Sequence, residues 1–109
     1  ELLVLAEKRR NIIPFLGDAQ LPKKYSPHTG IPDILYQDVA QRDQVEIFIR
    51  NYDFFGPKCG FLMLKSRSSP GKDNEVFRDS ERKMESRFKK VDAVDVTKWA
   101  KGHMAYYVE

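Results

Sequence analysis

Short continuous apolar runs alternate along this chain with a longer amphipathic segment, and this alternation limits the possible fold more than any other feature. Within residues 41–55 the apolar side chains recur three or four positions apart, at Val45, Phe48, Ile49, Tyr52 and Phe55. That spacing predicts an amphipathic helix. The runs on either side of it, residues 34–36 and 60–64, are apolar throughout, which is typical of buried strands. Strands joined through a helix predict an α/β fold with a parallel sheet and right-handed crossovers.

The remaining segments extend the same pattern. We expect further helices over residues 1–10 and 74–89, and further strands over residues 12–16, 91–96 and 103–108. Loops are expected over residues 20–32 and 68–73, where proline and glycine gather. Pro14 removes a backbone donor, so strand 12–16 should lie at or near a sheet edge. No helix separates the last two strands, and we therefore expect the final strand to run antiparallel.

Composition narrows the class of protein. The chain has 109 residues, of which 41% are hydrophobic, and that is enough for one small domain but not for two. The net charge of +3 is compatible with a polyanionic partner but does not demand one. Cys59 is the single cysteine, so neither an internal disulfide nor a metal site is expected, and a reducing intracellular setting fits. No apolar run approaches the ~20 residues of a membrane helix, so we expect no membrane partner.

A candidate site follows from where the predicted strands end, because ligands of open α/β sheets bind beyond the carboxyl ends of the strands. The first predicted strand ends at Asp18 and Ala19, the second at residues 38–41, and the third at residues 65–67. These positions would bring two carboxylates, an amide and a lysine to the same end of the sheet.

Each of these residues also has a simpler interpretation. Asp18 and Asp38 could equally well be the N-caps of the helices that follow them. Lys65 could be the first solvated residue after a buried strand, and a lone histidine such as His103 is more often structural than catalytic. We interpret Trp99 as a packing residue rather than as a platform on which a nucleobase stacks.

Several stretches resemble one family. Residues 11–19 followed by residues 33–44 are similar to the fibrillarin-like 2′-O-methyltransferases of archaea and eukaryotes, and the string Asp-Val-Ala-Gln-x-Asp-Gln at 38–44 is highly specific to them. Residues 61–68 resemble the strand that follows in the family, and residues 101–105 resemble its Lys-Asp-His-Ala motif. The resemblance extends over essentially the whole chain, and it is strongest from 11 to 67.

The resemblance implies the Rossmann-like fold of class I S-adenosylmethionine-dependent methyltransferases. Residues 1–109 would be the C-terminal part of that domain, with strands three to seven of its sheet. It implies methyl transfer from S-adenosylmethionine to a ribose 2′-hydroxyl of rRNA, or of tRNA in archaea, inside a box C/D guide ribonucleoprotein. The implied partners are a Nop-family scaffold protein, a kink-turn-binding protein and the guide RNA. We expect a cytoplasmic location in an archaeal host, the setting we favour, or a nucleolar one in a eukaryote.

The resemblance also implies roles for particular residues. The family uses a Lys-Asp-Lys-His tetrad, and its last three members match Asp38, Lys65 and His103 by position. The implied cofactor-binding residues are Asp18 and Ala19 in the adenine pocket and Asp38 and Gln41 near the methionine end.

Two departures from the family pattern leave alternatives open. The first lysine of the tetrad and the glycine-rich cofactor loop would precede Glu1, so we expect further residues upstream and poor folding of the chain without a complementing segment. Gly102 stands where the family usually has aspartate before the histidine. One alternative is therefore a docking module, or a truncated fragment, without catalysis. The other is a small-molecule methyltransferase of the same fold.

Overall fold

A computed structural model describes residues 1–68 and 71–109. The chain divides into two compact units, which we call the N-terminal unit (residues 1–30) and the C-terminal unit (residues 31–109). Each unit is described by itself. The expected loop over residues 68–73 includes residues 69 and 70, which lie outside the described residues. No helix in the described ranges has the length and apolar character needed to span a membrane.

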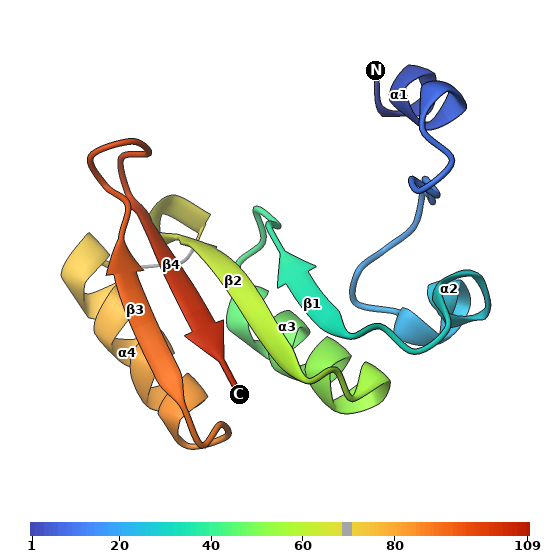
Figure 1. Cartoon of the computed structure of the whole chain (residues 1–109). Coiled ribbons are helices and arrows are strands. Elements are labelled where there is room, and N and C mark those ends of the chain that lie inside the picture. Colours follow the sequence, from blue (N-terminus) through green and yellow to red (C-terminus); the bar gives the residue numbers. More distant parts are fainter. Residues whose placement is uncertain (69–70) are drawn as a thin grey trace. The chain divides into compact units, whose positions relative to one another are not determined.

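The C-terminal unit contains a four-stranded sheet in the order β1-β2-β4-β3 (Figure 1). Its strands are β1 Ile34–Gln37, β2 Cys59–Lys65, β3 Val91–Asp95 and β4 His103–Val108. β1 and β2 are parallel and are joined through a helix, as predicted. β4 lies between β2 and β3 and is antiparallel to both. The prediction of an α/β fold with an antiparallel last strand is confirmed.

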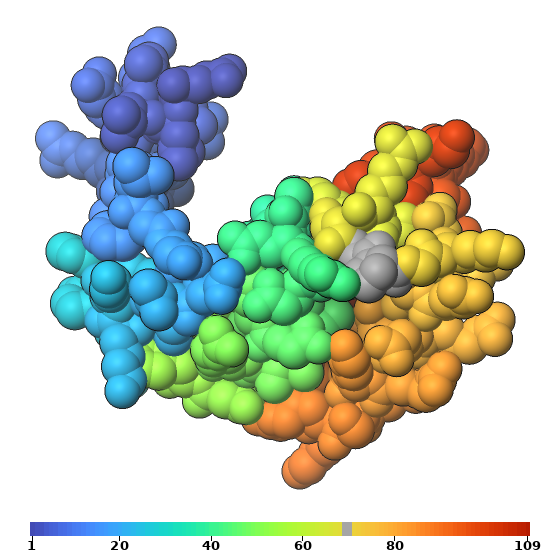
Figure 2. Space-filling model, turned by 180° about the vertical axis from the view of Figure 1, so that it is seen from behind, coloured from blue at the N-terminus to red at the C-terminus, as the bar shows by residue number. Residues whose placement is uncertain are grey.

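Two helices of the C-terminal unit lie against one face of this sheet (Figure 1). They are α3 Gln44–Phe55 and α4 Asp73–Glu85, and the short 3₁₀ helix η1 Ser66–Ser68 follows β2. Gly56 follows α3 as its C-cap. Its φ of +61° lies in the left-handed region, which glycine adopts at little cost because it has no Cβ. α4 has acidic residues in its first turn and basic residues in its last turn, an arrangement that the helix dipole stabilises. Figure 2 shows the outer surface of these helices from behind.

The core fills the space between the helices and the covered face of the sheet. Its buried side chains are Val45, Phe48, Tyr52, Leu62, Leu64, Val76, Phe77, Met84, Phe88, Tyr106 and Val108. β2 is apolar throughout its middle, and its buried large side chains are Leu62 and Leu64. Phe61, which alternates with them and so lies on the other face of the sheet, is 39% exposed. Tyr36 and Val94 are exposed as well. The sheet therefore buries one face and leaves an apolar second face open.

The N-terminal unit differs from the prediction in two places. Residues 12–16 form no strand, and within the described chain no strand adjoins them to pair with their backbone groups. Residues 20–32 are not all loop, because α2 Pro22–Thr29 forms there. Proline at the first helical position has the right φ and loses no hydrogen bond, so Pro22 starts this helix rather than preventing it.

The first helix is present as expected but buries no residue. α1 Leu2–Lys8 places leucine and valine side chains in solvent. The ring of Phe15 stacks on His28 with 5.0 Å between the centroids, and a second contact, to Tyr25, has 6.2 Å between the centroids. These ring contacts connect the extended segment to α2 within the N-terminal unit.

Candidate functional site

Asp38 and Lys65 meet at the carboxyl rim, the end of the sheet at which β1 and β2 finish. Asp38 directly follows β1, and Lys65 is the last residue of β2. Lys65 Nζ lies 2.6 Å from Asp38 Oδ1, and the two side chains are 24% and 46% exposed. Asp43, not Asp38, is the N-cap of α3, so the N-cap interpretation of Asp38 is wrong. Lys65 is likewise no merely solvated residue, because its ammonium group holds a carboxylate that is open to solvent on its other side.

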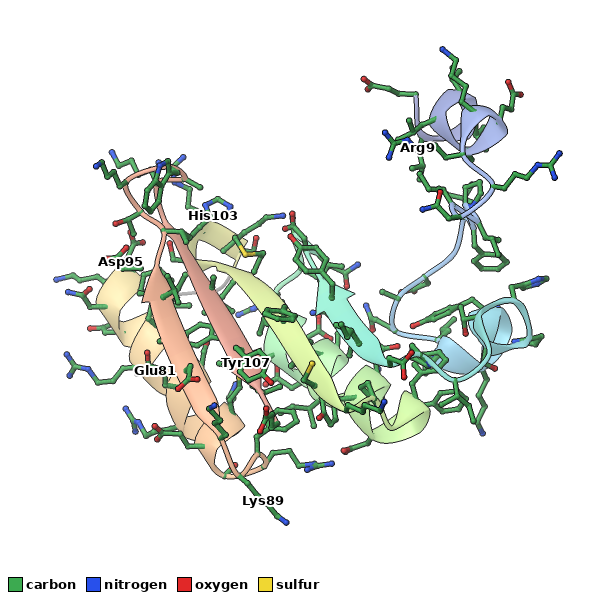
Figure 3. The ribbon with its side chains drawn as sticks, in the orientation of Figure 1. Arg9, Glu81, Lys89, Asp95, His103 and Tyr107 are labelled. Carbon is green, nitrogen blue, oxygen red and sulfur yellow. The ribbon has the colours of Figure 1, made fainter. Side chains whose placement is uncertain are left out.

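His103 begins β4 at the same rim, as Figure 3 shows. It is the register partner of Lys65 in the β2–β4 pair, and side chains directly opposite in an antiparallel pair share a face of the sheet. His103 Nδ1 lies 3.0 Å from the carbonyl oxygen of Lys101. A carbonyl only accepts hydrogen bonds, so Nδ1 carries the hydrogen, and in the neutral ring Nε2 is the acceptor. The structure thus brings Asp38, Lys65 and His103 to one rim.

Two buried glutamines fix this rim, and sequence reasoning assigned neither of them a role. The Gln44 side chain accepts a hydrogen bond from the Lys65 N–H at 3.0 Å and donates one to the Lys65 carbonyl at 2.9 Å. The carbonyl of Gln44 accepts from Gln37 Nε2 at 2.7 Å. Both side chains are almost fully buried. Together they close the loop that carries Asp38 onto the end of β2. The available signal was the position of Gln44 at the end of the family-specific 38–44 string.

Gly102, the departure from the family pattern, occupies a position that suits glycine. Its φ is +75°, a left-handed value that disfavours most side chains. A Cβ at this position would lie 3.0 Å from Ser66 Oγ, a buried hydroxyl that has no hydrogen-bond partner among the described residues. The Ser66 N–H donates to the Gly102 carbonyl at 2.8 Å. The backbone therefore holds the turn before His103, without help from a side chain at 102.

Asp18 and Ala19 belong to the N-terminal unit, where they form the turn that leads into α2. Asp18 Oδ1 accepts from the backbone N–H of Gln20 at 2.9 Å. The N-cap of α2 is Leu21, so the N-cap interpretation of Asp18 is wrong too. Tyr25 donates its hydroxyl hydrogen to the Ala19 carbonyl at 3.2 Å. Burial and the negative charge of Asp18 raise the pKa of Tyr25.

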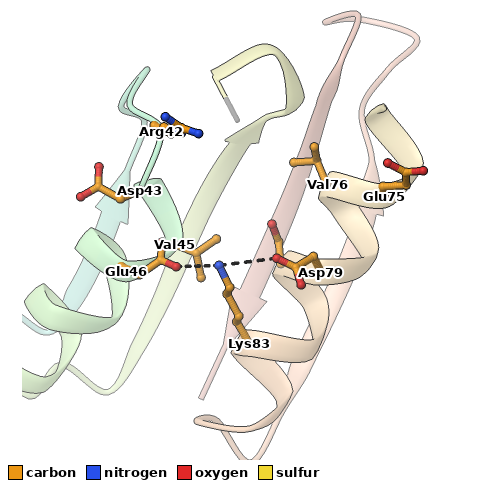
Figure 4. Close-up of a pocket in the computed structure, with 9 residues that line it drawn as sticks. Arg42, Asp43, Val45, Glu46, Glu75, Val76, Asp79 and Lys83 are labelled. Carbon is orange, nitrogen blue, oxygen red and sulfur yellow. Dashed lines mark hydrogen bonds and ion pairs between the residues drawn. The ribbon is translucent and has the colours of Figure 1, made fainter. Parts of the chain in front are cut away.

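A separate hollow lies between α3 and α4 and contains none of the predicted site residues (Figure 4). It measures about 510 Å³. Lys83 on α4 reaches Glu46 on α3 at 2.6 Å and Asp79 at 3.5 Å. Partial burial raises the pKa of Glu46, but the hydrogen bond and charge of Lys83 outweigh it, so the pKa is lowered overall. This lysine is thus occupied in joining the two helices.

The polar groups at the carboxyl rim suit an amino-acid-like ligand. Asp38 is a half-exposed carboxylate, and Gln41 stands three residues later in the same loop, before α3. A carboxylate and an amide can together bind an ammonium group and its neighbouring carboxylate. Within residues 1–68 and 71–109, no group of three or more His, Cys, Asp or Glu side chains is placed to hold a metal ion.

Comparison with known proteins gives a consistent result. The family model described as fibrillarin matches residues 1–109. The fibrillarin-like rRNA/tRNA 2′-O-methyltransferase of Methanocaldococcus jannaschii is 40% identical over 111 residues, which cover 97% of this chain and 48% of that protein. The chain spans about half the length, or less, of the curated relatives that it matches.

Solved structures agree with the sequence comparison. A chain of a crystallised fibrillarin/Nop5p complex superimposes with a TM-score of 0.90 at 35% identity, covering 97% of this chain and 53% of that one. The fibrillarin of Aeropyrum pernix, crystallised with natively bound S-adenosyl-L-methionine, superimposes with a TM-score of 0.76 at 30% identity. The match covers 98% of this chain and 49% of that structure.

Proposed function

Because this chain belongs to the fibrillarin family, we propose that the protein is an S-adenosylmethionine-dependent RNA 2′-O-methyltransferase that acts on rRNA or tRNA. The chain is the C-terminal part of the methyltransferase domain in this proposal. The observation that carries it is the 2.6 Å pair of Asp38 and Lys65, with His103 in register across the strand. These are the positions at which the family resemblance places three members of its tetrad.

The chemistry requires activation of a poor nucleophile. A ribose hydroxyl attacks slowly unless a neighbouring group accepts or polarises its proton. Asp38 has an open carboxylate that can take a hydrogen bond from the 2′-hydroxyl and accept its proton. Lys65 orients this carboxylate through the ion pair, and His103 offers Nε2 as a further acceptor beside it. Holding the hydroxyl in line with its target contributes much of the rate enhancement in such transfers.

S-adenosylmethionine, when bound, supplies a methyl group on a positively charged sulfur. In this proposal Asp38 and Gln41 hold its methionine end, and Asp18 and Ala19 line the adenine pocket. The chemistry of Asp38 and Gln41 supports their assignment to the methionine end, since a carboxylate and an amide can bind the ammonium and carboxylate groups of an amino acid. The A. pernix relative with its natively bound cofactor supports the choice of ligand.

The proposed setting is a box C/D guide ribonucleoprotein with a Nop-family scaffold, a kink-turn-binding protein and guide RNA. The crystallised complex of a related fibrillarin with Nop5p supports the scaffold. The guide pairs with the target, so the protein need not read sequence, and a net charge of only +3 suffices for phosphate contacts that position the RNA. We propose a cytoplasmic location in an archaeal host.

The test is methyl transfer by the full-length protein in a particle reconstituted with scaffold, kink-turn-binding protein and guide RNA. Asp38→Ala should lower transfer from labelled cofactor to guide-matched RNA by at least about 100-fold and leave particle assembly intact. Asp33→Ala is the matched control, because Asp33 pairs with Lys58 at 3.4 Å at the opposite end of the same strands. Asp33→Ala should leave the rate unchanged.

The outcomes separate the possible functions. Full activity of Asp38→Ala would remove this residue from the mechanism. A wild-type particle that assembles but transfers no methyl group would identify a docking module instead. Methyl transfer to small molecules without dependence on the guide RNA would identify a small-molecule methyltransferase of the same fold.

A further inference from the structure

We propose that Trp99 is a stacking platform for an unpaired nucleobase of the RNA strand being methylated, with Lys98 and Lys101 contacting its phosphates. The inference rests on the proposed function, since it assigns a residue that binds the RNA substrate. It concerns the loop between β3 and β4. Of the site residues discussed above, only Gly102 and His103 lie near this loop in the sequence, at the end where β4 begins.

Trp99 is not the packing residue that the sequence suggested. Its side chain is 77% exposed, and so the packing interpretation is wrong. Tryptophan is the largest apolar side chain, and it is highly buried on average in folded proteins. A flat indole ring left in solvent has a free face on which another flat group can stack.

Local hydrogen bonds order the backbone of the loop that carries this ring. Asp95 Oδ1 accepts from the Thr97 backbone N–H at 2.8 Å and from the Thr97 hydroxyl at 2.6 Å. The Trp99 N–H then donates to the Val96 carbonyl at 2.9 Å. Figure 3 labels Asp95 and His103 at the two ends of this loop. A platform that is ordered before binding loses less conformational entropy when a ligand arrives.

The charges around Trp99 favour RNA over other ligands. Lys98 Nζ lies 5.7 Å from the centre of the Trp99 ring, within cation–π range. Residues 96–103 include a second lysine, Lys101, and no carboxylate. Among the described residues neither ammonium group has an ion-pair partner. Aromatic rings interleaved with free cations are how proteins bind single-stranded nucleic acid, the ring taking a base and the cations its phosphates.

The loop is tied directly to the carboxyl rim. The Ser66 N–H, one residue after Lys65, donates to the Gly102 carbonyl at 2.8 Å. Trp99 stands three residues before Gly102, so their Cα atoms are separated by at most about 11 Å of chain. Trp99 is therefore held near the carboxyl rim, and the base that stacks on it belongs to unpaired RNA beside the stretch that the guide pairs.

Trp99 is the single tryptophan of residues 1–109, so the test uses the full-length protein with any tryptophan outside this range replaced by phenylalanine. A single-stranded oligoribonucleotide should quench Trp99 fluorescence as it stacks. In a separate assay with labelled RNA, Trp99→Leu should bind at least about fivefold more weakly, and Trp99→Tyr should retain most of the affinity. Lys98→Gln should weaken binding, whereas Lys58→Gln, which removes an equal charge at the opposite end of the strands, should weaken it less.

Several results would overturn the assignment. Equal binding by Trp99→Leu and the wild type is one, and equal quenching by heparin and by RNA is another, since heparin has charge but no bases. Quenching by the scaffold protein and not by RNA would make Trp99 a protein contact. Asp38→Ala separates this inference from the proposed reaction, because that variant should lose methyl transfer and retain the quenching by RNA.

Discussion

The two units treat similar apolar runs in opposite ways. Residues 61–64 in the C-terminal unit lie within β2 and bury Leu62 and Leu64, whereas residues 12–16 in the N-terminal unit form no strand. Leu62 is fully buried, and Leu16 is 100% exposed. The difference lies in the neighbours, since β2 has a strand on each side. An apolar run becomes a strand only where another strand completes its backbone hydrogen bonds.

The sharpest test of this contrast removes one large apolar side chain from each unit. Phe48 is fully buried in the core, so Phe48→Ala should lower the free energy of unfolding by about 3–5 kcal/mol. Leu16→Ala should change it by less than about 0.5 kcal/mol. Urea unfolding followed by far-UV circular dichroism is the measurement, because the single tryptophan is exposed and reports on the core poorly. A large effect of Leu16→Ala would mean that Leu16 is buried in the folded protein, and it would contradict the contrast between the two units.

The next largest effect should come from the glutamine that fixes the carboxyl rim. Gln44→Ala leaves the N–H and carbonyl of Lys65 without their partner, and we expect a loss of about 2–4 kcal/mol in unfolding free energy. Asn11→Ala in the N-terminal unit is the control, because Asn11 is exposed, and it should cost less than about 0.5 kcal/mol. A Gln44→Ala protein as stable as the wild type would show that water replaces the amide fully.

Adding a single methyl group at a glycine in each unit tests the same contrast between the two units. A methyl group at Gly60 would meet Phe48 Cζ at 2.7 Å, and one at Gly17 would meet Phe15 Cε1 at 2.6 Å. Phe48 is held in the core, whereas Phe15 is exposed and can rotate away. Gly60→Ala should therefore cost about 1–3 kcal/mol of unfolding free energy. Gly17→Ala should be close to neutral in the same measurement, and equal losses at the two sites would contradict this difference in rigidity.

The smallest effect concerns the ion pair between α3 and α4. The pKa of Glu46 is lowered in the folded protein, so the pair contributes stability above the ordinary carboxyl pKa, and this contribution is lost as the pH falls through the folded value. Both side chains are 46% exposed, which limits the effect to about 0.5 kcal/mol. Glu46→Gln should remove that part of the acid dependence of unfolding. If the unfolding free energy of Glu46→Gln varied with pH as it does in the wild type, the acid dependence would belong to other carboxylates.

The regular spacing of apolar residues predicted most of the helices and strands correctly. The spacing of apolar residues placed α3 and α4 within a few residues, and residues 103–108 form β4 with the expected bounds. The prediction of a strand over residues 12–16 was wrong, because an apolar pattern indicates which side chains can be buried and contains no information about a neighbouring strand. α2 was missed because the prolines and glycine of residues 20–32 indicated a loop, although proline at a helix start is favourable.

The sequence pointed to the charged residues of the candidate site and to Gln41, but not to the two buried glutamines that hold the rim. Asp38 and Lys65 could be placed by the rule that ligands meet the carboxyl ends of strands. Gln44 and Gln37 could not, because their role consists of hydrogen bonds to backbone atoms that only the folded chain brings near. Exposure of Trp99 was likewise beyond the sequence, since an aromatic residue near a strand end reads the same whether it faces a core or solvent.

The open second face of the sheet, with Tyr36, Phe61 and Val94 in solvent, has a consequence for how the chain behaves at high concentration. β1 is an edge strand of the sheet, and an edge beside an apolar face can accept a strand from another molecule. When residues 1–109 are expressed on their own, self-association should therefore compete with folding as their concentration rises. A lysine in place of Tyr36 would blunt this edge, and the soluble yield should rise without any change in the buried core.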